Sequence, residues 1–167
     1  MTHLPDLNKP ILSYLSRVNP HSILELGSGC GHWAKIFNRP EYVGVESWGP
    51  YLVEARHLPT RIRADARLVP FRPRTFDVVL VLELLEHLTH QDGIRLLQDA
   101  KTISKKAVLV STPADFVEQG ALNGNPAERH ISLWTRADLQ ACGFTVTEFR
   151  SSDGIWQRFW IGMCNVD

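Results

Sequence analysis

Short runs of β-branched residues alternate along the chain with stretches that carry apolar residues at helical spacing. Residues 76–82 (FDVVLVL) are almost continuously apolar, which is typical of a strand buried on both faces of a parallel sheet. Residues 91–104 place Ile94, Leu97 and Ala100 on one side, which predicts an amphipathic helix. The alternation predicts an α/β fold in which helices cover a parallel sheet.

The other predicted elements continue this pattern. We expect strands over residues 22–26, 42–45, 60–64, 107–111, 144–150 and 155–164, and helices over residues 10–18, 31–38 and 51–57. A further helix is expected between an N-cap at Thr135 and a C-terminal Gly143. Pro70 and Pro73 exclude a regular helix after the third strand. The turn at residues 151–154 predicts that the last two strands form an antiparallel hairpin at one edge of the sheet.

Composition narrows the classes of protein that fit. A length of 167 residues predicts a single domain over residues 1–167. The 18 basic residues balance the 18 acidic residues, which argues against non-specific adhesion to nucleic acid or membrane but leaves room for a local basic face. Cys30, Cys142 and Cys164 lie far apart, so we expect no disulfide framework and no zinc ribbon. No signal peptide or membrane span is recognisable, and a cytoplasmic location is expected.

Residues 25–31 (ELGSGCG) contain the first motif with chemical meaning, because they join a predicted strand to a predicted helix. Glycines there let the chain turn sharply and let a ligand approach the backbone, and the helix start offers N–H groups to an anion. Glu46 ends the next strand, where doubly wound folds place an acid that binds ribose hydroxyls. A nicotinamide dehydrogenase would require glycine at the position of His32. The motif therefore favours a different nucleotide cofactor.

With these residues the chain resembles the class I S-adenosylmethionine-dependent methyltransferases, and within them the methyltransferase type 11 or ubiquinone-biosynthesis-like group. The resemblance extends over nearly the whole chain through residues 69–71, 76–88, 110–113 and 130–144. It implies a compact, Rossmann-like, doubly wound sheet of seven strands in the order 3-2-1-4-5-7-6, with strand seven antiparallel. It also implies that residues 25–31 hold the methionine half of the cofactor, Glu46 the ribose and Asp65 the adenine amino group. The full set of cofactor-binding residues expected on this basis is Glu25, Gly27, Ser28, Gly29, Gly31, Glu46, Ser47, Asp65, Ala66 and Leu82.

The implied function is methyl transfer from S-adenosyl-L-methionine, with S-adenosyl-L-homocysteine as product. Because this is an in-line displacement, most of the catalysis lies in holding the two reactants together, and a base is needed only where the acceptor atom loses a proton. His87 and His130 are the candidate catalytic residues. They have structural alternatives: a contact with the cofactor or a helix start for His87, and packing of a lid for His130. We expect an oxygen or nitrogen atom of a small molecule as acceptor.

A metal-assisted enzyme is the alternative. Its ligand set would be Glu83, Glu86, His87 and His130, which resembles the metal set of small-RNA 2′-O-methyltransferases. The first three also match ubiquinone-biosynthesis O-methyltransferases. Such ligands suit a divalent ion that clamps vicinal hydroxyls of RNA or of a small diol. Relatives without a metal use the same acids to cap the next helix, so the expectation remains a metal-free site. A cofactor-binding partner subunit without catalytic activity is the third alternative.

The surroundings of the site are predicted less directly. Residues 112–134 form one long connection, which in a compact domain is usually functional and here should face the acceptor. Trp134 is expected to line the acceptor pocket, where an aromatic face can attract the sulfonium. We expect an open site, completed by a large substrate, a mobile lid or another subunit, in a monomer or homodimer. The arginines should form a solvated edge near the adenine, offset by Asp65 and Asp77, with an RNA-binding edge as the alternative; they are Arg61, Arg63, Arg67, Arg72 and Arg74.

Overall fold

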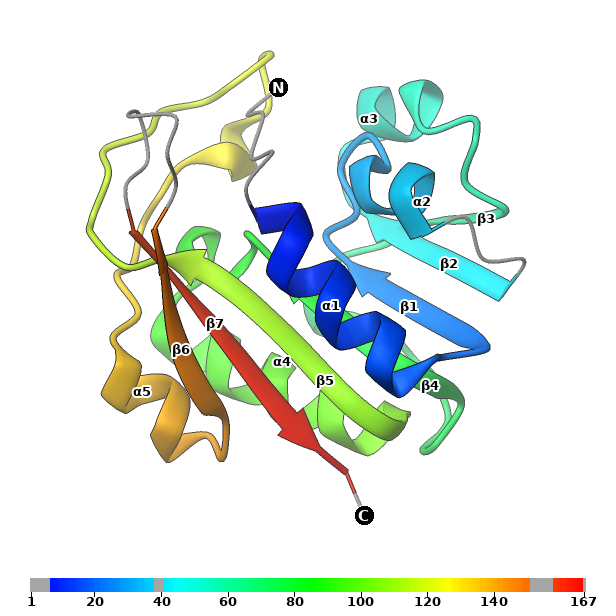
Figure 1. Cartoon of the computed structure of the whole chain (residues 1–167). Helices are drawn as coiled ribbons and strands as arrows, with labels where there is room; N and C mark the ends of the chain where they lie inside the picture. Colours follow the sequence, from blue (N-terminus) through cyan, green and yellow to red (C-terminus); the bar gives the residue numbers. More distant parts are fainter. Residues whose placement is uncertain (1–6, 38–40, 151–157, 167) are drawn as a thin grey trace.

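One seven-stranded sheet organises the computed structural model, which describes residues 7–37, 41–150 and 158–166 (Figure 1). The strands are β1 (Ser22–Leu26), β2 (Glu41–Glu46), β3 (Thr60–Arg63), β4 (Phe76–Leu82), β5 (Ser104–Pro113), β6 (Thr145–Arg150) and β7 (Arg158–Asn165). Their order is β3-β2-β1-β4-β5-β7-β6. Strands β1 to β5 pair in parallel, and β7 runs antiparallel to both β5 and β6. The predicted strand order and the antiparallel seventh strand are confirmed.

Helices cover both faces of this sheet. They are α1 (Asn8–Val18), α2 (His32–Phe37), α3 (Gly49–Glu54), α4 (His90–Ile103) and α5 (Arg136–Ala141). Figure 1 shows α1 and α4 on opposite sides of the sheet. The side chains of β4 alternate accordingly: Val78 and Leu80 pack in the cluster that contains α1, whereas Val79 and Val81 pack in the cluster that contains α4. This two-sided burial explains why β4 is apolar at nearly every position.

Several boundaries differ from those expected. Helix α3 begins at Gly49, because Pro50 suits a first turn, and ends at Glu54 rather than at residue 57. Strand β5 is longer than expected, because β7 pairs with it as far as Pro113. Only a 3₁₀ turn, η2 (Ala66–Leu68), follows β3, in agreement with the two prolines. The predicted turn at residues 151–154, and the first three residues of the predicted last strand, lie outside the described residues.

Two local predictions about α5 are confirmed. Thr135 forms a capping box with Asp138, and Gly143 has the left-handed φ of 86° that ends such a helix. None of the helices within the described ranges is long and apolar enough to cross a membrane.

The carboxyl ends of the central strands meet at one edge of the sheet. Leu26 of β1 pairs with Val45 of β2 and with Val81 of β4, so the segments after these strands leave the sheet side by side. Leu82 pairs with Ser111, which brings the end of β5 to the same edge. In open α/β sheets this edge is the usual place for a ligand.

Candidate active site

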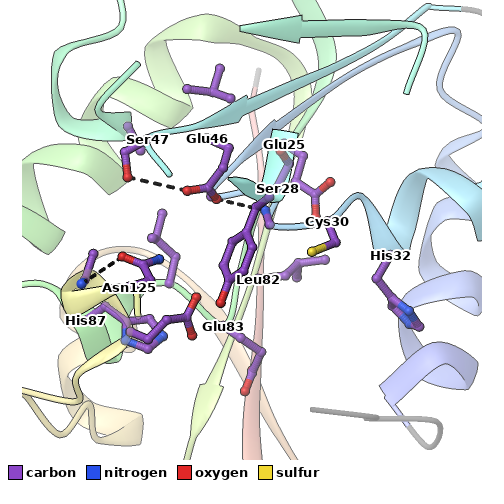
Figure 2. Close-up of a pocket in the computed structure, with 18 of the residues that line it drawn as sticks. Glu25, Ser28, Cys30, His32, Glu46, Ser47, Leu82, Glu83, His87 and Asn125 are labelled. Carbon is purple, nitrogen blue, oxygen red and sulfur yellow. Dashed lines mark hydrogen bonds between the residues drawn. The ribbon is translucent and has the colours of Figure 1, made fainter. Parts of the chain in front are cut away.

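A cavity of about 390 Å³ opens at this edge (Figure 2). Its lining comes from the segments that follow β1, β2, β3 and β4, and from residues 122–128 of the long connection after β5. Of the residues expected to bind the cofactor, all except Gly31 line this cavity. The sheet therefore gathers into one cavity residues that lie up to 57 positions apart, from Glu25 to Leu82.

The glycine-rich loop after β1 presents its backbone to the cavity. The amides of Gly27 and Ser28 both donate to the carbonyl of Val45 at 2.9 Å, which fixes the loop on β2. Gly27 has a φ of 74°, and a Cβ there would lie 2.9 Å from Leu84. Gly29 has a φ of 51° and no atom within 4 Å of the place that a Cβ would take. Glycine is needed at both positions for the left-handed backbone, and at Gly27 also for space.

Glu46 connects the glycine-rich loop to the start of α3. Its carboxylate accepts hydrogen bonds from the amide of Gly29 at 2.9 Å and from the amide of Trp48 at 2.7 Å. The side chain is only 8% exposed, yet it lines the cavity beside Ser47 (Figure 2). A carboxylate fixed in this way can accept hydrogen bonds from the two hydroxyls of a ribose.

Glu25 lies deeper, with 1% of its surface exposed, and the hydroxyl of Tyr42 donates to it at 2.7 Å. Burial raises the pKa of Glu25 from 4.5 to about 8, and the charge of Glu46 adds to this rise, whereas the bond from Tyr42 opposes it. A carboxyl group in this environment either keeps its proton or requires a cation nearby.

Asp65 stands at the rim of the cavity and is held by Arg67. The Arg67 guanidinium approaches the Asp65 carboxylate to 2.6 Å and also contacts Asp92 of α4 at 3.1 Å. The hydrogen bond from Arg67 lowers the pKa of Asp65, although partial burial opposes the change. The expectation that Asp77 also offsets the arginines is wrong, because Asp77 pairs with Lys106 at 2.9 Å and with Lys105 at 3.8 Å.

The two candidate catalytic histidines are brought together although they lie 43 positions apart in the sequence. The ring centroids of His87 and His130 are 4.9 Å apart. Nδ1 of His87 lies 3.2 Å from the carbonyl oxygen of Arg129, and Nδ1 of His130 lies 2.7 Å from that of Val117. Because a carbonyl can only accept, these contacts favour the tautomer in which Nδ1 carries the proton and Nε2 carries the lone pair.

Glu86 completes a group of three. One ligand atom each from Glu86, His87 and His130 lie within 4.8 Å of one another. Burial strongly raises the pKa of Glu86, and the charge of Glu83 adds to the rise. Burial also lowers the pKa values of His87 and His130, so both imidazoles are neutral near pH 7. The two neutral imidazoles offer donor atoms to a divalent cation, whereas Glu86 keeps its proton unless a cation lies nearby.

Glu83 lies outside this group of three. Its backbone φ is 52°, and its carboxylate accepts a hydrogen bond from Ser111 at 2.7 Å. Burial raises the pKa of Glu83 to about 7. Neither glutamate caps α4, since that role belongs to Thr89, whose hydroxyl accepts from the amide of Asp92 at 3.1 Å. The helix-capping explanation of the Glu-His-Leu segment therefore does not apply to this chain.

The prediction for Trp134 is wrong. Its ring is fully buried on the side of α4, where it stacks on His90 with centroids 4.6 Å apart and packs against Gly93. The indole N–H donates to the carbonyl oxygen of Leu85 at 3.0 Å. The apolar character of residue 134 thus serves the core and not the cavity.

Several cavity residues were not predicted from the sequence, among them Tyr51, Asn123, Asn125 and Glu128. Tyr51 was assigned to a helix without a function. The other three belong to the long connection, where the pairs Asn123–Gly124 and Asn125–Pro126 indicate turns and not a function.

Comparison with known proteins identifies the family of the chain and shows which solved structures share its fold. A family model described as a methyltransferase domain matches residues 2–148. No curated protein matches the chain. The structure is similar to magnesium protoporphyrin IX methyltransferase from Synechocystis PCC 6803 with bound S-adenosylhomocysteine, with 12% identity and a TM-score of 0.73 over 96% of this chain and 82% of that one.

Two further solved structures share the fold. The methyltransferase domain of the bacterial protein CtHen1 is 19% identical, with a TM-score of 0.68 over 96% of this chain and 98% of that one. A possible histamine N-methyltransferase from Thermotoga maritima is 18% identical, with a TM-score of 0.64 over 95% and 89%. The chain belongs to the methyltransferase-domain family and is an enzyme of class I that takes its methyl group from S-adenosyl-L-methionine.

Proposed function

We propose that this enzyme methylates a hydroxyl oxygen of a small molecule, which binds beside a divalent cation held by Glu86, His87 and His130. The observation that carries the proposal is the close approach of these three side chains, within 4.8 Å, with both imidazole lone pairs on Nε2. This reverses the expectation of a metal-free site and takes up the metal-assisted alternative.

The cofactor belongs in the 390 Å³ cavity. In the proposed placement, Glu46 accepts hydrogen bonds from the ribose hydroxyls, and Asp65 accepts one from the adenine amino group. The methionine half lies along the glycine-rich loop, whose backbone is open to the cavity at Gly29. Its α-ammonium group is the cation that the buried Glu25 requires.

The donor set fits a first-row divalent cation such as Mn²⁺. A carboxylate and two neutral imidazoles are ligands for first-row divalent ions, and imidazoles that ligate metals usually donate their second N–H to a backbone carbonyl or a carboxylate. Both histidines do so here, toward Arg129 and Val117. A cation at this position would lower the pKa of an acceptor hydroxyl. Glu83 lies close enough to raise the pKa of Glu86 and would add negative charge to the same region.

His87 links the two parts of the site, because it lines the cavity and also belongs to the group of three. Glu86 and His130 do not line the cavity. An acceptor oxygen beside His87 would therefore meet the methyl donor at the boundary between the two parts. Holding both reactants at this boundary supplies the proximity on which methyl transfer depends.

A small molecule is favoured over RNA as the acceptor. Arg67, the arginine that lines the cavity, is already paired with Asp65 and Asp92. The formal net charge of zero also gives the chain no general attraction for a polyanion.

Direct measurement of Mn²⁺ binding tests the proposal without knowledge of the acceptor. Isothermal titration of Mn²⁺ into the chain saturated with S-adenosylhomocysteine should show one strong site in the wild type. His130→Ala should weaken Mn²⁺ binding at least tenfold. Loss of a residue that only hydrogen-bonds a metal ligand already lowers metal affinity by about 10–100-fold, and His130 is proposed as a ligand itself. His21→Ala is the matched control, because His21 is an exposed residue that contacts Glu41 away from the site. Absence of a site in the wild type, or equal affinities for the His130 variant and the wild type, would refute the metal-assisted reaction.

A further inference from the structure

Residues 117–130 of the long connection form a strap with an ordered tip. Its two arms are joined by hydrogen bonds from the His130 amide to the Gln119 carbonyl oxygen at 3.1 Å and from the Gln119 side chain to the Glu128 carbonyl oxygen at 2.7 Å. At the tip, Leu122 and Asn125 form an isolated β-bridge. Asn123 and Gly124 between them have φ values of 50° and 72°. Two successive positive φ values and an Asn-Gly pair are typical of a type I′ turn, so the tip is a defined structure.

The tip contacts a second segment of the cavity lining, helix α3. The side-chain amide of Asn123 donates to the hydroxyl of Tyr51 at 3.3 Å, across 72 positions of sequence. Tyr51 belongs to α3, which follows Glu46 and Ser47, and its side chain is 8% exposed. Burial raises the pKa of Tyr51, and the nearby Glu128 carboxylate adds to the rise, so the hydroxyl stays protonated at neutral pH. Tyr51, Asn123 and Glu128 all line the cavity, so this contact lies beside the space assigned to the cofactor.

We propose that Tyr51 and Asn123 form a latch that retains the cofactor and must open each time S-adenosylmethionine enters or S-adenosylhomocysteine leaves. The inference rests on the cofactor placement of the proposed function and is independent of the cation. It assigns positioning roles to two residues that carry no motif. Of the three expected ways of completing the open site, it takes up the mobile lid and assigns that lid to the chain's own connection.

The test removes the hydrogen bond from each side. Tyr51→Phe deletes the hydroxyl and keeps the ring, whereas Asn123→Gly deletes the amide and keeps a residue that favours the left-handed backbone of the turn. Tyr14→Phe and Asn19→Gly are matched controls, because Tyr14 is a buried tyrosine whose hydroxyl bonds Asn165, and Asn19 has a φ of 44° at the end of α1. The dissociation rate of S-adenosylhomocysteine is measured by stopped-flow fluorescence without metal or acceptor, and melting temperatures report on folding.

We expect each latch variant to release S-adenosylhomocysteine about fivefold faster, which corresponds to the net contribution of one hydrogen bond. The double variant should be no faster than Tyr51→Phe alone, because the phenylalanine already removes the hydroxyl that Asn123 contacts, together with its contact to Glu128. The control variants should release it at the wild-type rate. An unchanged rate in either latch variant, or effects that multiply in the double variant, would overturn the latch. If Glu46→Ala fails to weaken binding of S-adenosylhomocysteine, the cofactor placement is wrong. If Glu46→Ala weakens binding but the latch variants release S-adenosylhomocysteine at the wild-type rate, only the latch is wrong.

Discussion

At the scale of single residues, Glu46 both holds the backbone around the cavity and is placed to bind the cofactor. Its carboxylate anchors the amides of Gly29 and Trp48, and in the proposed placement it also receives the ribose hydroxyls. Because these tasks use the same oxygens, the protein holds the group in position before the cofactor arrives. Such preorganisation spares the cofactor the cost of ordering the loop.

Replacement of Glu46 by alanine should therefore raise the Kd for S-adenosylhomocysteine at least tenfold, through the loss of charge-assisted hydrogen bonds. Glu41→Ala is the matched control, since Glu41 begins the same strand and is an exposed residue at its opposite end. Calorimetric titration measures both variants. Near-normal affinity in the Glu46 variant would contradict the assignment.

The buried carboxyl group of Glu25 should make stability depend on pH. Burial and the nearby charge of Glu46 raise its pKa in the folded state from 4.5 to about 8, despite the bond from Tyr42. The folded state therefore binds a proton that the unfolded state has lost, and the free energy of unfolding falls as pH rises through this interval. Urea denaturation at about pH 5 and about pH 8 should show a smaller loss in Glu25→Gln than in the wild type. Equal losses in the two proteins would show that Glu25 does not titrate in this range.

The residues predicted from the sequence are those whose position is set by a nearby strand end. Gly29, Glu46 and Asp65 each lie within a few positions of a predictable strand, and all three line the cavity. Tyr51 and Asn123 were not predicted, because their role arises only when a connection folds back over α3. Trp134 was assigned to the wrong surface, since a tryptophan near a functional loop fits a core as well as a pocket.

At the scale of elements, the contact between α4 and the segment before α5 is unusually close. A Cβ added to Gly93 would lie 2.2 Å from Cζ2 of Trp134. The indole is held on its other side by the ring of His90 and by its bond to the Leu85 carbonyl oxygen, so it cannot move aside easily. Glycine in the middle of α4 is thus required for packing, although it lowers helix propensity.

Gly93→Ala should accordingly destabilise the protein. The substitution gains about 1 kcal/mol of helix propensity. It loses more through overpacking, which typically costs about 1–3 kcal/mol and is at its worst against a rigid ring. Gly120→Ala provides the control, because no atom lies within 4 Å of its added Cβ. Denaturant titration should show a lower free energy of unfolding for the Gly93 variant and little change for the Gly120 variant. A Gly93 variant as stable as the wild type would show that the Trp134 ring moves aside to make room for the added methyl group.

Element boundaries were predicted best where burial alone determines them. Strand β4 was predicted to the residue, because both of its faces are buried and the residues that flank it, Thr75 and Glu83, are polar. Strand β5 was predicted too short, since its first residue, Ser104, pairs with Phe76 of β4 and its last residue, Pro113, pairs with β7, which lies far away in the sequence. Helices α2 and α3 have six residues each, and helices this short depend on tertiary contacts more than on their own sequence.

At the scale of the whole molecule, the parallel sheet makes the site. It brings the ends of β1, β2, β4 and β5 to one edge, and the connection after β5 returns His130 to Glu86 and His87. The sequence resemblance indicated these residues as a set. It could not determine whether they meet, because that depends on the backbone bonds from Ile131 and Ser132 to the Glu86 carbonyl oxygen.

A crystal structure of the chain with S-adenosylhomocysteine and Mn²⁺, analysed by anomalous scattering, tests the proposed metal site most directly. We predict the cofactor in the cavity, with its ribose on Glu46, and a single strong anomalous peak at Glu86, His87 and His130. A cofactor in that cavity without Mn²⁺ at these side chains would contradict the metal-assisted reaction.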